Sequence, residues 1–239
     1  MKKKLIEIFP WIGMIKRFLF AIYHHLLPIK VTYAQHGEDR FISTQLIDYN
    51  LDSGIYIDIG ANHPTVISNS YLFYRKGYKG LIIEPNSELI KLFRIFRPKD
   101  IAVEIGCGDE AELKIFYISK TPVLSSFSKE SIDSFGMKNN VWSTKYLPIL
   151  PLDILVNQIQ INWVFFMSID VEGSDYECLI GAKNTLEKTL FLSIEVNNLE
   201  LETQIVDFLK SINFSFLIKL GCNDIFKNQS ESFKVFKGK

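Results

Sequence analysis

Short apolar runs and longer amphipathic stretches alternate along most of this chain. A run of β-branched and aromatic residues that ends at a glycine, a proline or a carboxylate is typical of a buried strand. Eight runs are predicted to be strands: residues 55–59, 80–85, 101–106, 113–119, 163–170, 192–196, 214–220 and 233–236.

Between these runs, apolar residues recur at the spacing of helices that bury one face. The predicted helices cover residues 38–49, 68–76, 87–96, 152–158, 175–190 and 201–211. Asn86 or Ser87 is expected to cap the third of them, and Gly77 ends the second. The alternation predicts an α/β fold with a mostly parallel sheet and helices on both faces. Residues 121–151 are polar, aromatic and irregular, which indicates a lid or a binding loop.

Residues 31–239 are predicted to form one domain, and residues 1–30 a basic, aromatic helical extension. The extension carries lysines at positions 2–4 and mixes bulky apolar residues with Lys16 and Arg17. These charges interrupt any apolar run long enough to span a bilayer, and no signal-peptide cleavage site follows. Two interpretations stay open. The helix packs on the domain or on a partner subunit, as in a homodimer, or it lies on the inner face of a membrane.

The composition excludes several classes of protein. With 47% hydrophobic and 23% charged residues, the 239-residue chain is predicted to be globular. Lys plus Arg equals Asp plus Glu at 27 each, so no basic field indicates nucleic acid as a partner. Cys107, Cys178 and Cys222 are odd in number and too widely spaced for a zinc site, which favours a reducing, cytoplasmic compartment.

Ligands of open parallel sheets bind beyond the carboxyl ends of the strands, so the residues that end each strand are candidates for chemistry. The first strand ends in Asp58-Ile59-Gly60-Ala61-Asn62. Gly60 allows a tight turn and a close approach of a ligand, and Asp58 suits a cationic ammonium better than a pyrophosphate. A plain turn after a strand would look similar. A dinucleotide site would need further glycines, which do not follow Gly60.

Glu84 ends the second strand, where a carboxylate can accept two hydrogen bonds from a ribose diol. Alternatively, Glu84 is a charge that favours the dipole of the following helix near Ser87. Two successive acidic strand ends are less expected by chance than one. Pro85 and Asn86 follow Glu84 directly and are expected at the same part of a site for an adenosyl ligand.

Four segments resemble the FkbM-type methyltransferases and occur in the order of that family. They are QHGED at 35–39, IYIDIGANHP at 55–64, SNSYLFYRKGYKGLIIEPN at 68–86 and SIDVEGSDYECLIGA at 168–182. The resemblance implies a Rossmann-like class I methyltransferase fold with S-adenosylmethionine as the methyl donor. It also implies O-methylation of a sugar or another hydroxyl-bearing natural product, as in polysaccharide biosynthesis.

The same resemblance assigns parts of the cofactor site by motif. Glu84 would hold the ribose, and the turn from Glu104 to Asp109 would flank the adenine, although this turn matches the family only loosely. His36 and Glu38 could close over the cofactor, or Glu38 could be a first-turn charge. The methionine end of the cofactor would be lined by four residues: Asp58, Gly60, Ala61 and Asn62.

Candidate catalytic residues follow the first and fourth main strands. Asp170 or Glu172 could act as a general base or orient the acceptor, with or without a divalent cation bridging carboxylate and hydroxyls. Glu172 could instead hydrogen-bond neighbouring backbone to hold its loop. His63 follows the cofactor turn and is a candidate base, although a histidine that caps or lies at the surface fits equally.

Candidate acceptor-binding residues lie in two places. Glu195 and Asn197 end the strand after the Asp170 strand and would face the acceptor. Ser125 and Ser126, in the irregular segment with aromatic residues around them, suit a sugar. We therefore expect an O-methyltransferase with a small-molecule or glycan acceptor. The alternatives are a non-catalytic binding module on a methyltransferase scaffold and an NAD-dependent oxidoreductase.

Overall fold

The computed structural model describes residues 10–119, 125–129, 132, 141–171, 173–196 and 199–237. Its main sheet has seven strands in the order β3-β2-β1-β7-β8-β10-β9. The first five in this order are parallel, and β10 is antiparallel to both of its neighbours. The strands are β1 Ile55–Ile59, β2 Gly80–Ile83, β3 Ile101–Val103, β7 Val164–Ile169, β8 Thr189–Glu195, β9 Phe214–Leu220 and β10 Asn223–Asn228.

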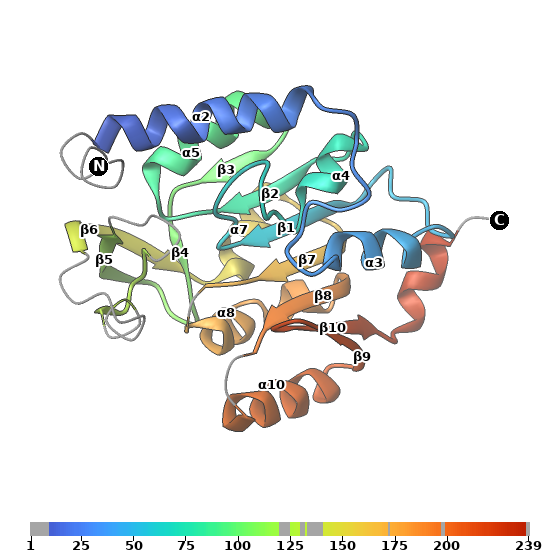
Figure 1. Cartoon of the computed structure of the whole chain (residues 1–239). Helices are drawn as coiled ribbons and strands as arrows, with labels where there is room; N and C mark the ends of the chain where they lie inside the picture. Colours follow the sequence, from blue (N-terminus) through green and yellow to red (C-terminus); the bar gives the residue numbers. More distant parts are fainter. Residues whose placement is uncertain are drawn as a thin grey trace.

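Helices cover both faces of this sheet (Figure 1), which confirms the predicted α/β fold. Strand β1 shows how the faces divide: Tyr56 joins the core beneath α3, α4 and α5, and Ile57 joins the core beneath α7 to α10. The helices are α2 Pro10–Leu26, α3 Glu38–Gln45, α4 Tyr71–Arg75, α5 Ser87–Phe96, α7 Leu152–Ile159, α8 Asp175–Gly181, α9 Lys183–Leu186, α10 Leu199–Ser211 and the 3-10 helix η2 Glu231–Phe236.

A second, three-stranded sheet lies beside the first and corrects the prediction of an irregular segment at 121–151. It consists of β4 Gly106–Cys107, β5 Glu112–Ser119 and β6 Val141–Leu150 in the order β4-β6-β5. Strand β6 pairs antiparallel with β5 along its length. Most β6 side chains are exposed or half-buried, so the strand lacks the apolar pattern by which buried strands are found.

Several further boundaries differ from the prediction, and three of them change how the chain is divided into elements. The last strand is β10, whereas 233–236, predicted as a strand, belongs to η2. Strand β10 begins with Asn223 and Asp224, polar residues that are uncommon in strands. The predicted helix at 175–190 divides into α8 and α9 and ends before β8 begins at Thr189. The third strand ends at Val103 and does not continue to Gly106.

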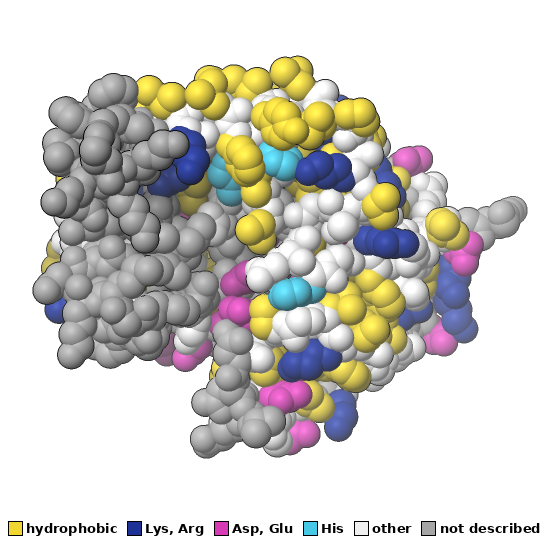
Figure 2. Space-filling view, viewed as in Figure 1, with side chains coloured by type: hydrophobic (Ala, Val, Ile, Leu, Met, Phe, Trp, Pro, Cys, Tyr) yellow, Lys and Arg dark blue, Asp and Glu magenta, His cyan; other side chains and the backbone are white. Residues whose placement is uncertain are grey.

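The N-terminal helix α2 lies across α5 (Figure 1). Ala21 is fully buried there, packed in one cluster with Leu89, Leu92 and Phe96. The opposite side of α2 is exposed and apolar, and Figure 2 shows hydrophobic side chains gathered along this edge of the molecule. The helix therefore packs on the domain and also keeps an exposed apolar face. None of the described helices is both long and apolar enough to cross a membrane.

Candidate active site

A cavity of about 880 Å³ opens at the carboxyl ends of the parallel strands. Its volume lies near the upper end of the range for small-molecule sites, which leaves room for two ligands. It brings together most of the residues predicted from the strand ends: Asp58, Gly60, Ala61, Asn62, His63, Glu84, Pro85, Ser125, Ser126, Asp170 and Glu195.

The floor of the cavity is formed where the ends of β1 and β7 meet. Gly60 has a φ of +75°, and a Cβ atom at this position would lie 1.7 Å from the carbonyl oxygen of Asp170. The Asp170 backbone N–H also donates to the Ile59 carbonyl oxygen at 3.0 Å. Only glycine fits both the left-handed backbone and this contact. The turn after β1 is therefore packed directly on the loop that carries Asp170.

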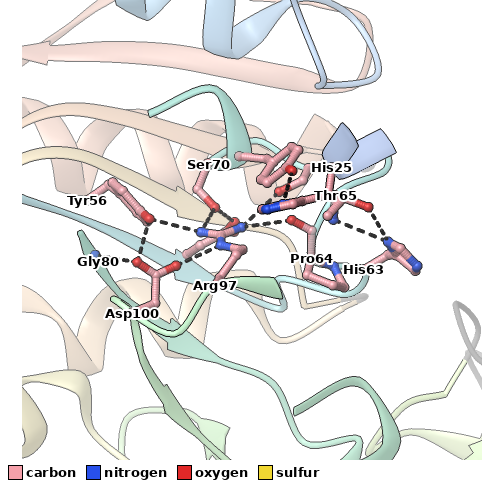
Figure 3. Close-up of polar contacts among 12 residues, drawn as sticks. His25, Tyr56, His63, Pro64, Thr65, Ser70, Gly80, Arg97 and Asp100 are labelled. Atoms are coloured by element: carbon pink, nitrogen blue, oxygen red, sulfur yellow. Dashed lines mark hydrogen bonds and ion pairs between the residues drawn. The ribbon is translucent and has the colours of Figure 1, made fainter. Parts of the chain in front are cut away.

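Asp58 is joined through Ser70 to a buried polar network around Arg97, and Figure 3 shows Arg97 with Ser70, Tyr56 and Asp100. The Asp58 carboxylate accepts a short hydrogen bond from the Ser70 hydroxyl, and Arg97 Nη2 donates to Ser70 Oγ at 2.9 Å. Arg97 also forms an ion pair with Asp100 at 2.7 Å, with both side chains inaccessible to solvent. Burial raises the pKa of Asp58, and the hydrogen bond from Ser70 and the charge of Arg97 oppose this rise. The network holds the Asp58 carboxylate in one position at the cavity wall.

Glu84 closes the neighbouring wall at the end of β2. Its two carboxylate oxygens accept hydrogen bonds from the backbone N–H groups of Asn62 and Asn86, each at 2.8 Å. Burial raises the pKa of Glu84 to about 7, and the two backbone donors only partly oppose the rise. Asn86 lies outside the cavity lining, and its side chain caps α5 by accepting from the Glu88 N–H.

The loop after β7 is held by Asp175, a residue that the sequence patterns did not single out. Its carboxylate accepts hydrogen bonds from the N–H groups of Val171 and Gly173, at 3.0 and 3.1 Å. Burial raises the pKa of Asp175 to about 6. Holding the loop is the structural role considered above for Glu172. The predicted site residues Glu172 and Asn197 lie outside the described residues.

The cavity is also lined by residues at the open ends of β8 and β10. Glu195 is the last residue of β8, and Asn223, the first residue of β10, is its direct cross-strand partner. Cys222 lies beside them, and burial together with the charge of Glu195 raises the pKa of its thiol to about 11. Sequence reasoning missed Asn223 because the last strand was placed ten residues too late, and a strand-initial Asn after Gly221-Cys222 was the available signal.

The family model of the methyltransferase FkbM domain matches residues 58–216 of the chain. The chain belongs to the FkbM methyltransferase family. The match includes the end of β1, all of β2, the second sheet and β7, and therefore most of the cavity walls. It confirms the family inferred from the four sequence segments, and with the observed sheet it establishes the fold of S-adenosylmethionine-dependent methyltransferases.

Solved structures that resemble this FkbM methyltransferase include three other methyltransferases at low similarity. The N-terminal domain of human METTL16 in complex with SAH is 12% identical, with a TM-score of 0.44 over 82% of this chain and 68% of that one. The putative RNA methyltransferase PH1948 from Pyrococcus horikoshii is 14% identical, with a TM-score of 0.42 over 87% and 96%. The precorrin-6y C5,15-methyltransferase from Geobacter metallireducens GS-15 is 15% identical, with a TM-score of 0.42 over 86% and 94%. No curated protein matches the chain.

The side of the FkbM cavity near β3 and the second sheet is mainly apolar. Ile105, Cys107 and Phe116 line it, and Ser125 and Ser126 lie on this side. The two serines were predicted to bind the acceptor, and the structure places them beside the wall where the family resemblance expects adenine. Ser126 pairs with Tyr117 of β5 through two backbone hydrogen bonds.

Besides Asn86, three residues predicted for the cofactor lie outside the cavity lining formed by the described residues. Glu104 pairs with Lys145 of β6 at 2.7 Å, and Asp109 is exposed to solvent. Glu38 is fully buried and accepts hydrogen bonds from the His36 N–H and from Asn223 Nδ2, at 2.9 and 2.7 Å. Glu38 therefore contacts a cavity residue without reaching the cavity itself.

His63 reaches the cavity with one of its two ring nitrogens already hydrogen-bonded. Its Nδ1 accepts a hydrogen bond from the Thr65 N–H at 3.2 Å (Figure 3), so the neutral ring carries its proton on Nε2. Burial lowers the pKa of His63 to about 4 and outweighs the opposing influence of the Arg17 backbone. Nε2 is buried and makes no hydrogen bond of normal geometry with the described residues, so its interaction with the Arg17 backbone is a weak one. At neutral pH, this nitrogen is a donor.

Helix α2 supplies the remaining wall through Lys16, Arg17 and Phe20. These residues lie on the segment that sequence reasoning treated as an extension, so their contribution was missed.

The described residues contain no group of three or more His, Cys, Asp or Glu side chains arranged to hold a metal ion.

Proposed function

We propose that this FkbM methyltransferase transfers a methyl group from S-adenosylmethionine to a hydroxyl group of a sugar or a related glycan. The observation that carries this proposal is the continuity of the cavity. One space connects Asp58, Gly60 and Glu84, which suit the donor, with Asp170 and Glu195, which suit a hydroxyl-bearing acceptor. Carboxylates accept hydrogen bonds from hydroxyl groups and can take up their protons.

The residues of the donor side fit S-adenosylmethionine in charge and hydrogen bonding. Glu84 has lone pairs left after its two backbone contacts, and these can accept from the ribose diol. Asp58 and the turn at Gly60 offer a carboxylate and an accessible backbone to the methionine end. The apolar wall of Ile105 and Phe116 suits the face of adenine.

The chemistry requires little covalent participation by the protein. Bound S-adenosylmethionine supplies a methyl group activated by its positive sulfonium. The acceptor oxygen forms a bond to the methyl carbon as the bond from carbon to sulfur breaks, and the hydroxyl proton must leave. Asp170 is the carboxylate best placed to take this proton, because it lies on the loop packed against the Gly60 turn. His63 would donate a hydrogen bond to the acceptor from Nε2.

Calorimetry with S-adenosylmethionine and with NAD tests the donor. We expect heat and thermal stabilisation with the first compound and neither with the second. If NAD alone bound, the oxidoreductase alternative would replace the proposal. Incubation with labelled methyl donor and a set of nucleotide sugars and glycans then tests the acceptor. Donor binding without methyl transfer to any hydroxyl compound would favour a non-catalytic binding module.

We also propose that the exposed face of α2 lies on an anionic membrane surface in the cytoplasm. Leu19, Tyr23 and Leu26 are 58%, 58% and 78% exposed on this helix. Residues 8–37 contain no Asp or Glu, whereas Lys16 and Lys30 carry positive charge, and Arg17 is paired with Glu88 of α5 at 3.5 Å. An amphipathic helix with these features fits an anionic bilayer better than a neutral one, since each Lys or Arg near the surface contributes about 1 kcal/mol. The three free cysteines fit a reducing compartment.

A further inference from the structure

Glu195 and Asn223 lie side by side at the open edge of the main sheet. They are cross-strand partners in the antiparallel pair of β8 and β10, and both line the cavity. Directly opposed residues in such a pair have Cβ atoms about 4.5–5.5 Å apart. Their side chains can therefore contact two neighbouring groups of one ligand.

Each of these side chains has one oxygen whose hydrogen-bonding capacity is unused by the described residues. These atoms are Glu195 Oε2 and Asn223 Oδ1, and both are buried. Asn223 as a whole is only 4% exposed. Buried polar atoms in folded proteins nearly always have partners, because an unpaired one costs about 1–3 kcal/mol. A ligand in the cavity that offers hydrogen-bond donors would remove this cost.

The orientation of the Asn223 amide is determined by Glu38. Asn223 Nδ2 lies 2.7 Å from Glu38 Oε1, and a carboxylate can only accept at this distance. The amide nitrogen must therefore face Glu38, which leaves Oδ1 as the free acceptor. Glu38 is itself fixed, since its other oxygen accepts from the His36 N–H at 2.9 Å.

The turn that carries Asn223 is also held by the segment before α3. Gly221 has a φ of +62°, and a Cβ atom there would lie 2.1 Å from the ring of His36. The QHGED segment at 35–39 thus contacts the turn between β9 and β10 at Gly221 and at Asn223. Its contacts hold a residue of the cavity wall, whereas the sequence offered closure over the cofactor as one role for His36 and Glu38.

We infer that Asn223 and Glu195 together accept hydrogen bonds from two neighbouring hydroxyl groups of the methyl acceptor, and that Glu38 is the positioning residue that aims Asn223. The inference rests on the proposed function, because it concerns the acceptor of that reaction. Two adjacent acceptor atoms favour a vicinal diol of a sugar ring over a ligand with a single hydroxyl group. A compound that lacks one of the two hydroxyls leaves a buried oxygen unpaired and is discriminated against.

The test compares three variants of the full-length protein. Asn223→Leu removes the acceptor at nearly the same size, and Glu38→Gln lets the Asn223 amide turn over. Asn228→Leu is the matched control, because Asn228 is a buried residue of the same strand whose amide bonds the Leu186 carbonyl instead. For each variant we would measure the melting temperature, the affinity for S-adenosylhomocysteine, and binding of methyl glycosides of mannose, galactose and glucose with their monodeoxy forms.

We expect Asn223→Leu and Glu38→Gln each to weaken binding of at least one methyl glycoside by about tenfold, the effect of losing one hydrogen bond. Removing the matching hydroxyl from the glycoside should have the same effect in the wild type and little further effect in Asn223→Leu. S-adenosylhomocysteine affinity should stay unchanged in both variants, and Asn228→Leu should bind glycosides as the wild type does.

Three results would overturn the inference. The first is that Asn223→Leu binds every glycoside as the wild type does. The second is that Asn223→Leu loses affinity for S-adenosylhomocysteine, which would assign the pair to the methyl donor. The third is that the wild type binds none of the glycosides. The proposed function fails separately, if S-adenosylmethionine does not bind or if no hydroxyl compound is methylated. If an acceptor is methylated and its KM is the same for Asn223→Leu as for the wild type, this inference alone would be contradicted.

Discussion

The carboxylate of Glu84 accepts two backbone hydrogen bonds and still titrates near neutrality, because burial penalises its charge more than the two donors favour it. Its folded pKa of about 7 lies above the ordinary value of 4.5. Protonation of Glu84 therefore stabilises the ligand-free protein fully below about pH 4.5, and this contribution is lost as the pH rises through 7. A ligand that donates hydrogen bonds to the Glu84 carboxylate favours its ionised form instead.

Cofactor binding is therefore expected to depend on pH. Ribose hydroxyls that donate to ionised Glu84 lower its pKa, so affinity for S-adenosylmethionine should rise with pH and level off above about pH 7. Below that point the affinity should fall by up to about tenfold per pH unit. Calorimetry across this range measures the effect, and Glu84→Gln should flatten the profile. A profile with the same slope in Glu84→Gln would assign the dependence to another group.

The donor and acceptor sides should respond differently to single substitutions. Glu84→Ala is expected to weaken S-adenosylmethionine binding by about tenfold or more, since it removes an acceptor of charge-assisted hydrogen bonds. Asp170→Ala should mainly lower kcat, by roughly a hundredfold or more if the residue takes up the proton. Binding and single-turnover measurements on both variants separate the effects. Equal loss of cofactor affinity in the two would contradict these roles.

Arg97 is expected to be a major determinant of stability. It is 0% exposed, pairs with Asp100, and donates to Ser70 and to the Tyr56 hydroxyl. Arg97→Leu leaves the Asp100 carboxylate buried without its partner, which should lower the free energy of unfolding by about 3–5 kcal/mol. Urea denaturation measures this change. Arg94→Leu, on the exposed side of α5, the helix that ends just before Arg97, is the control and should change stability by less than about 0.5 kcal/mol.

At the level of elements, α2 is expected to contribute to stability through one small buried side chain. Ala21 is 0% exposed against Leu89, Leu92 and Phe96 of α5. Ala21→Asp places a charge in this contact and should separate the helix from the domain, with a fall in melting temperature of several degrees. Leu26→Asp, on the exposed side, should leave the melting temperature nearly unchanged. Similar melting temperatures for the two variants would show that the contact is weak.

The elements that sequence patterns predicted well are those whose burial is complete. Strand β1 was predicted to the residue, and helix α5 with its cap narrowed to Asn86 or Ser87. Every position of β1 after the first is buried, and α5 has a capping Asn and one apolar face. Strand β6 was missed because it is largely exposed, and β10 because it begins with two polar residues. Asp58 and Glu84 were predictable as site residues because they end buried strands that the apolar pattern identifies. Asn223 was not, because its position depends on a hairpin between β9 and β10.

On the scale of the whole molecule, α2 connects a proposed membrane surface with the cavity. One side of the helix carries Lys16, Arg17 and Phe20, which line the cavity, and another carries exposed apolar residues (Figure 2). An acceptor held at a bilayer surface would then meet the cavity beside the lipid headgroups. A glycan that is attached to a lipid would be an acceptor of this kind.

Binding to lipid vesicles tests the proposed membrane contact. The protein should sediment with vesicles that contain phosphatidylglycerol and much less with pure phosphatidylcholine, and salt should weaken the association. Leu19→Asp combined with Tyr23→Asp should lower the bound fraction by about tenfold. Val235→Asp is the matched control, because Val235 is 77% exposed on η2, far along the chain. Equal binding of the double variant and the control would exclude α2 as the contact.

The contact between Gly60 and the Asp170 carbonyl also bears on how ligands come and go. The turn after β1 and the loop after β7 are joined by this close contact and by the hydrogen bond from the Asp170 N–H to the Ile59 carbonyl oxygen, so a movement of either segment would disturb the other. We therefore expect ligands to enter and leave past the walls formed by α2 and the second sheet. The floor of the cavity would then keep its shape from one turnover to the next. The rate at which the used cofactor is exchanged would depend on α2 and the second sheet, and not on the residues proposed to take part in methyl transfer.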